Sequence, residues 1–234
     1  MPSTAEQRLV RALERAQALH AEREAAPASA DALDRLARWQ TRRLNATYAD
    51  LARDPRYAEA IEFFQTDLYG PGDYSRRDTD LARVVPTMMR LLPQGAVTTV
   101  AKAIELSALS QELDRRVAAE LDAASPLTVR SYCIAYRAAG ERADRERQIA
   151  LIVEVGRALD GYVQLPLLGS ALAAMRGPAW IAGLASLQGL LEHGLKAFRS
   201  MHGATQFLAV VETRETALLR AIMNGDDAPF PDPS

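Results

Sequence analysis

Apolar side chains recur along this chain at alternating steps of three and four residues, and this spacing restricts the fold more than any other feature. Positions three and four apart lie on one face of an α-helix, whereas a β-strand alternates every second residue. No stretch of the sequence alternates in the strand manner, so we expect an all-α protein. The clearest helical run contains Leu33, Leu36, Ala37, Gln40, Leu44, Thr47, Tyr48 and Leu51.

Start and stop residues divide the chain into nine or ten expected helices. Asp54-Pro55 and Ser125-Pro126 each place a capping side chain before a proline, which the first helical turn tolerates. Gly70 and Gly140 are typical helix ends. The first two helices are expected to form an antiparallel hairpin. The expected helices are Thr4–Ala25, Asp31–Leu51, 55–70, Arg76–Leu92, Val97–Ala123, 126–140, Arg142–Val163, Leu165–Met175, Pro178–Ser200 and Ala204–Met223.

The domain organisation predicted from these helices is simple. Residues 1–225 contain neither an internal repeat nor a long linker, which favours a single bundle-like helical domain. Residues 226–234 are acidic and rich in proline, which is typical of an extended tail. Phe230 is the one large apolar side chain with which this tail can dock on the domain.

The overall charge gives no support to nucleic-acid binding. The 234 residues carry a formal net charge of −2, so the whole chain has no positive field that attracts a polyanion. The most apolar region, residues 161–191, is interrupted by Arg176, Gly177 and Pro178. Each half is shorter than the roughly 20 residues that a membrane-spanning helix needs. We therefore expect buried core helices and no membrane span.

Cysteine and histidine usage argues against disulfides and metal centres. Cys133 is the only cysteine, and His20, His193 and His202 have no familiar metal-ligand spacing with it. We expect no metal and no cofactor. Charged residues interrupt the apolar positions near the N-terminus, unlike the core of a signal peptide. A cytoplasmic location in a reducing compartment fits these features.

The most distinctive polar group surrounds the turn after the stretch FFQTDLYG, residues 63–70. Arg76 and Arg77 begin the next expected helix, where the helix dipole disfavours cations. Either aspartates such as Asp73, Asp78 and Asp80 pair with them, or an anionic ligand binds there, because helix N-terminal N–H groups and guanidinium groups together attract anions. The tentative ligand-binding residues are Asp67, Tyr69, Tyr74, Arg76 and Arg77.

Two other polar side chains fall on apolar helix faces. Glu215 lies between Val211 and Leu218, so its carboxylate is either buried with a partner, for which arginine is expected, or reaches past the helix edge. Cys133 has no cationic neighbour in sequence and is interpreted as a small buried apolar residue rather than a nucleophile. We assign no catalytic residue.

The residues Phe63, Phe64, Leu68, Tyr69 and Gly70 resemble the motif FFLEELYG, after which a group of uncharacterised, mainly proteobacterial proteins is named. This chain departs from the motif at Gln65 and Thr66 and has Asp67 in place of glutamate. The resemblance extends over most of the chain, including the turn at residues 75–78 and the segment 176–179. It implies an all-helical protein and no assigned activity.

Two main functional hypotheses follow from the sequence, and a third and weaker one is nucleic-acid binding through an arginine face, which should show steep salt dependence. The first is a non-catalytic helical interaction module that self-associates or binds a protein partner, through the N-terminal hairpin or the glycine-containing helix that begins at Pro178. The second is a small-molecule binding protein or enzyme with an anionic ligand at the turn after FFQTDLYG. We favour the first, and therefore do not expect an enzyme.

Overall fold

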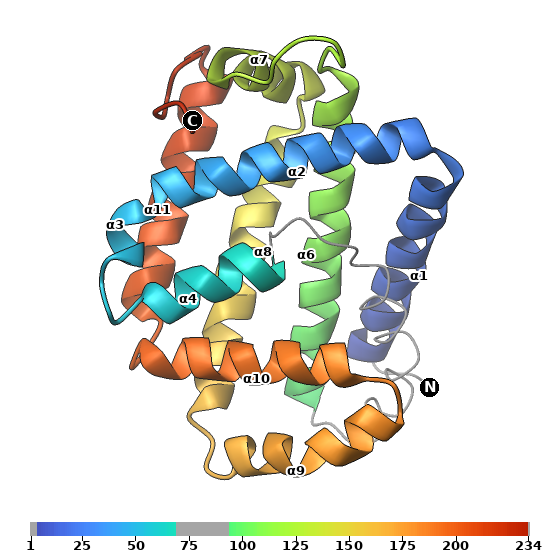
Figure 1. Cartoon of the computed structure of the whole chain (residues 1–234), viewed down its shortest axis with the longest axis vertical. Helices are drawn as coiled ribbons and strands as arrows, with labels where there is room; N and C mark the ends of the chain where they lie inside the picture. The colour runs from blue at the N-terminus through green and yellow to red at the C-terminus, as the bar shows by residue number, and fades with distance from the viewer. Residues whose placement is uncertain (1–3, 69–93, 234) are drawn as a thin grey trace.

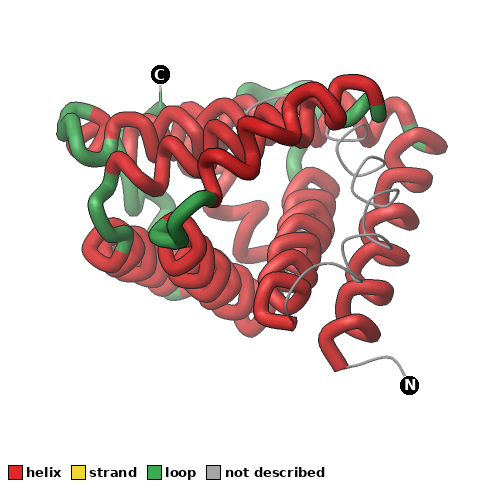
Figure 2. The backbone as a smooth tube through the Cα atoms, turned by 90° about the horizontal axis from the view of Figure 1, so that it is seen from below, coloured by secondary structure: helices red, strands yellow, loops and turns green. Residues whose placement is uncertain are grey.

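The computed structural model describes residues 4–68 and 94–233, and all regular structure in these residues is helical, as predicted (Figures 1 and 2). Ten α-helices and one π-helical turn are present in these two ranges. Their bounds are α1 Thr4–Ala25, α2 Pro27–Thr47, α3 Ala49–Ala52, α4 Ala58–Phe63, the π-helix η1 Phe64–Leu68, α6 Gln94–Ala119, α7 Val129–Ala139, α8 Arg142–Val163, α9 Leu168–Ile181, α10 Ala185–Ser200 and α11 Thr205–Met223.

The long helices cross rather than forming one parallel bundle. In Figure 1, α6, α8 and α11 run alongside one another, and α2, α4 and α10 cross them. Helix α7 lies at the end where α6 and α11 finish, and α9 lies at the opposite end, after α8. This arrangement gives the molecule an α7 end and an α9 end.

The two N-terminal helices are consecutive, but they do not form the expected antiparallel hairpin. Helix α1 lies along α6, and α2 turns away after Ala26 to cross the molecule (Figure 1). The reason is that the apolar face of α1 finds its partner on α6, where Leu9 and Ala16 pack with Val97 and Ile104. Burial of that face, and not the short connection, sets the direction of α2.

The stretch FFQTDLYG begins in α4 and continues through η1. The expected helix start at Pro55 is instead a turn, and α4 begins at Ala58. A π-helical turn is wider than an α-helical turn, which changes the direction of the side chains that follow it. Phe63 is buried, whereas Phe64 is half-buried and stacks on Phe207 at 5.7 Å between ring centroids. In the sequence, the helical step of three residues from Ile61 predicts Phe64 on the inner stripe and Phe63 at its flank.

The break expected at residues 176–178 lies further along the chain. Helix α9 continues through Pro178 and ends before Gly183, which has a φ of +73°. The Gly183 N–H donates to the Trp180 carbonyl and the Leu184 N–H to the Ala179 carbonyl, at 3.0 and 2.7 Å. These two bonds are those of a Schellman helix end, which glycine favours because it lacks a Cβ atom.

The shifted break exposes side chains that were expected in the core. Trp180 and Ile181 are 75% and 81% exposed, and Leu167 at the other end of α9 is 78% exposed. Large apolar side chains are therefore exposed at both ends of α9, and exposed apolar surface can mark an interaction site.

Buried apolar residues form three separate clusters in the residues that the structure describes. One joins α3, α4, α10 and α11, the second joins α2, α6, α7 and α11, and the third joins α1 and α6. The tail docks on the second cluster, because Phe230 is buried and its ring centroid lies 6.1 Å from that of Trp39. No helix in the described ranges has the length and apolarity needed to cross a membrane.

Candidate functional site

A large cavity lies between the three clusters of buried residues. Its volume is about 1150 Å³, and its walls come from α1, α2, α4 and α6 to α11, with side chains of all three clusters on its surface. Small-molecule pockets in proteins usually measure about 300–1,000 Å³, so this one is large enough for a small organic molecule.

The cavity wall changes character along its length. Near the α9 end it is mainly apolar, with Phe64, Leu159, Leu172, Leu190 and Leu195 among its lining side chains. Near the α7 end, charged and polar side chains of five helices converge on it. These side chains are Gln40 and Arg43 of α2, Asp114 of α6, Tyr132 and Tyr136 of α7, Arg145 and Gln148 of α8, and Glu215 of α11. We call this group the polar wall.

A largely buried ion pair joins α2 and α11 in the polar wall. Arg43 Nη1 donates to Glu215 Oε1 at 2.9 Å, and the Tyr48 hydroxyl donates to the same oxygen at 2.9 Å. The side chains of Arg43 and Glu215 are only 12% and 18% exposed. The prediction that Glu215 is buried with an arginine partner is therefore confirmed, and the two charges compensate one another.

Asp114 brings a second carboxylate into the polar wall. The Gln40 side-chain amide donates to its Oδ1 at 3.0 Å. Burial raises the pKa of Asp114, and the nearby Arg145 guanidinium and the Gln40 hydrogen bond offset this effect only in part. A carboxyl with a raised pKa beside a cavity is a group that can hold or exchange a proton.

Arg145 is the second cation of the polar wall and is only 5% exposed. Its guanidinium carbon lies 4.3 Å from the ring centroid of Tyr136, which is a favourable cation–π geometry. Burial raises the pKa of Tyr136 and of Tyr132, so both phenols are neutral at physiological pH. The wall therefore combines two cations, two carboxyls and two neutral phenols.

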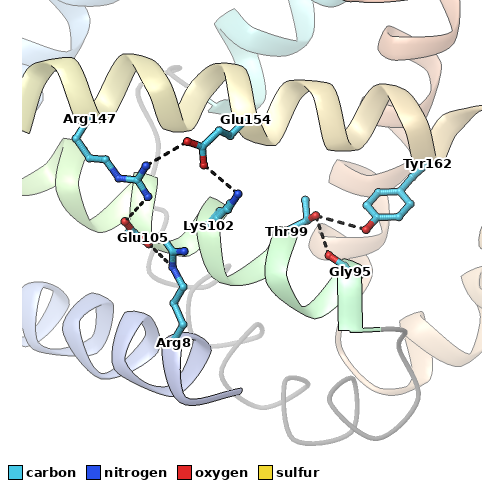
Figure 3. Close-up of polar contacts among 8 residues, drawn as sticks. All are labelled: Arg8, Gly95, Thr99, Lys102, Glu105, Arg147, Glu154 and Tyr162. Carbon is cyan, nitrogen blue, oxygen red and sulfur yellow. Dashed lines mark hydrogen bonds and ion pairs between the residues drawn. The ribbon is translucent and has the colours of Figure 1, made fainter. Parts of the chain in front are cut away.

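A second polar network ties the helices together outside the cavity (Figure 3). Glu105 of α6 contacts Arg8 of α1 and Arg147 of α8, and Glu154 links Arg147 to Lys102 at 3.2 and 2.9 Å. These side chains are about one-third exposed and do not line the cavity. The network fixes how α1, α6 and α8 lie against each other and thereby shapes the cavity wall.

One group of side chains has metal-ligand geometry. Glu59, Glu62 and His193 each place a ligand atom within 4.8 Å of the other two. However, Lys196 Nζ contacts Glu59 at 2.7 Å, and the His193 ring packs on the edge of Phe63 at 5.4 Å. These contacts are those of a surface ion pair and a packed histidine, so we assign no metal to the group.

The tentative site at the turn after FFQTDLYG falls outside what the structure describes. Tyr69, Tyr74, Arg76 and Arg77 belong to residues 69–93, and the side chain of Asp67 is likewise not described. The anion site at these residues stays a prediction.

The residues of the polar wall were mostly missed from sequence. The charged run at residues 142–147 is typical of solvated helix turns, yet Arg145 is buried. A signal was present, because Arg145 precedes Ile149 by four residues and therefore shares its inner face. The interpretation of Cys133 was correct: the thiol is buried, and burial raises its pKa to about 12.

Comparison with known proteins places most of the chain in one family. The family model described as "Domain of unknown function (DUF8198)" matches residues 19–229. The match includes all the residues of the polar wall. No curated protein and no solved structure matches the chain.

Proposed function

The chain belongs to this family of unknown function, and we propose that it binds an amphipathic small molecule in its internal cavity. The observation that carries the proposal is a cavity of about 1150 Å³ with one mainly apolar end and one polar wall. A molecule with an alkyl or ring portion and a polar head matches this division.

The size of the cavity supports an occupant. The cavity is partly open to solvent, so water and small molecules can enter it. Water molecules can form hydrogen bonds with the side chains of the polar wall. The apolar end of the cavity offers water few hydrogen-bond partners. An apolar group suits that end better.

A cavity-filling variant tests this function. Ser107 of α6 lines the cavity, whereas Ala119 of the same helix is exposed and does not. We expect wild-type protein to bind dodecanol saturably at one site in isothermal titration calorimetry. Ser107→Phe places a ring in the cavity and should weaken binding at least about tenfold. This corresponds to a loss of about 1.4 kcal/mol or more of binding free energy. Ala119→Phe should bind as wild type does.

Two results would contradict the proposed function. One is a wild-type protein that does not bind dodecanol or any related alkyl compound. The other is equal loss of binding in Ser107→Phe and Ala119→Phe, which would indicate adsorption on the outside of the protein.

Self-association is a second candidate function, favoured by the large apolar side chains exposed at both ends of α9. Leu167, Trp180 and Ile181 offer the large side chains that dominate protein interfaces. A second copy of the chain is the partner we propose. Light scattering coupled to size-exclusion chromatography should give a dimer for wild type and a monomer for the double variant Trp180→Ser, Ile181→Ser. A wild-type monomer at every concentration would exclude this function.

Several finer assignments remain predictions. They are membership of the FFLEELYG-motif group, its proteobacterial range, the cytoplasmic location, and the division into one domain and a tail at residue 225.

A further inference from the structure

Arg145 is a buried cation whose hydrogen-bonding capacity is largely unused. Its Nη1 donates to Gln148 Oε1 at 3.3 Å and its Nη2 to the Leu113 carbonyl at 3.4 Å, both beyond the usual 2.7–3.2 Å range. No carboxylate oxygen of the described residues lies within the 4.0 Å of a salt bridge to Arg145. A guanidinium group has five N–H donors, and buried charges normally have a partner. Arg145 lines the cavity, so the partner can come from there.

The surrounding charges leave room for one anion. Arg43 is already neutralised by Glu215 at 2.9 Å. Asp114 lies close enough to interact electrostatically with Arg145, but its carboxylate accepts a hydrogen bond from Gln40 and forms no salt bridge with Arg145. Among the residues that the structure describes, the other titratable groups that interact with Arg145 are Tyr132 and Tyr136 of α7, which are neutral phenols.

The cavity continues from Arg145 toward its apolar end. Ile149, Ile152, Val155 and Leu159 follow Arg145 along α8 and all line the cavity. A molecule that binds Arg145 with its head can therefore lay an apolar chain along α8 toward α9.

We propose that the ligand of this cavity is an amphipathic monoanion whose carboxylate binds the Arg145 guanidinium and whose alkyl portion fills the apolar end. This inference rests on the proposed function and specifies its ligand class. A carboxylate matches the planar guanidinium through two parallel hydrogen bonds. One carboxylate also balances one cation, whereas a phosphate monoester would add a second negative charge.

The first experiment compares two probes of equal chain length, dodecanoic acid and dodecanol, on the wild-type protein by calorimetry, at a pH where the acid is ionised. Hydrogen bonds to a charged group should make the acid bind about ten- to a hundredfold more tightly. Equal binding of the two probes would overturn the monoanion inference and leave the proposed function standing. Binding of neither probe would overturn the proposed function itself.

The second experiment removes the cation and keeps a matched control. Arg145→Met should abolish the preference for the acid while dodecanol still binds. Arg142→Met, three residues earlier on the same helix, exposed and outside the cavity, should keep the preference. An unchanged acid preference in Arg145→Met would refute the role of Arg145. Far-ultraviolet circular dichroism shows whether each variant is folded.

A third measurement needs only the wild-type protein. The carboxyl carbon of ¹³C-labelled dodecanoic acid reports its ionisation in the complex by its chemical shift. A guanidinium partner lowers the pKa of the bound acid below its value in water, whereas an apolar wall without a cation raises it. A bound acid that titrates at higher pH than the free acid would contradict the inference even if no Arg145 variant folds.

Discussion

At the residue scale, the polar wall is unusual because it places two arginines and two carboxyls in the interior. Arg43 and Glu215 compensate one another, whereas Arg145 and Asp114 do not form an ion pair. Buried charges are expensive unless they are paired and hydrogen-bonded, so such residues are retained at sites with a function more often than in an ordinary core.

The pair of Arg43 and Glu215 gives a stability prediction. Glu215→Gln leaves the Arg43 charge buried without a counter-charge, and we expect the free energy of unfolding to fall by about 3 kcal/mol. The double variant Arg43→Met, Glu215→Met removes both charges and should recover most of this loss. Urea unfolding followed by circular dichroism measures both. A double variant less stable than Glu215→Gln would show that the pair contributes more than charge compensation.

Sequence reasoning was informative at this scale where a polar residue interrupts a regular apolar stripe. Glu215 between Val211 and Leu218 was recognised for that reason, and its arginine partner was expected. Arg145 was missed because it lies among Arg142, Asp144, Glu146 and Arg147, a run that resembles a solvated helix start. The packing of α8 against α6 and α7 decides which charged side chain of such a run points inward. A local sequence pattern contains no information about that packing.

At the element scale, glycine has opposite effects inside and at the end of a helix. Gly161 lies within α8, and Gly225 follows α11 with a φ of +98°. A Cβ atom added at either position meets no atom within 4 Å, so only the backbone conformation distinguishes them.

This contrast predicts stability changes of opposite sign. Gly161→Ala should raise the free energy of unfolding by up to about 1 kcal/mol, because alanine is the better helix former. Gly225→Ala should lower it by about 1 kcal/mol, because alanine is strained at positive φ. Thermal unfolding of the two variants beside wild type measures the difference. If the free energy of unfolding changed in the same direction in both variants, the result would contradict the helix end at Asn224.

Helix existence was predictable, and helix boundaries and directions were less so. The three-and-four spacing identified α1, α8 and α11 with ends close to those observed, whereas α2 begins and ends four residues earlier than expected and α10 begins seven residues later. The break expected at residues 176–178 was misplaced because glycine and proline at residues 177–178 are strong local stop signals, yet α9 continues past them to Ile181. The direction of α2 was wrong because the partner of α1 is α6, which is distant in sequence.

At the scale of the whole molecule, the notable feature is an interior divided into three clusters around a cavity. The crossing of α2, α4 and α10 over α6, α8 and α11 holds the clusters apart (Figure 1). No pattern in the sequence predicted this cavity, because its walls come from helices that are far apart along the chain. The fold class was predictable from local spacing, whereas the candidate site exists only in the assembled molecule.

The most direct test of the central claim locates a ligand within the cavity. Crystals of the protein with a terminally brominated dodecanol should show an anomalous bromine peak between α8 and α10, near Leu159 and Leu195 at the apolar end of the cavity. A peak on the outer surface of α9 beside Trp180 would contradict the account. So would the absence of an ordered bromine at a ligand concentration that saturates the protein in calorimetry.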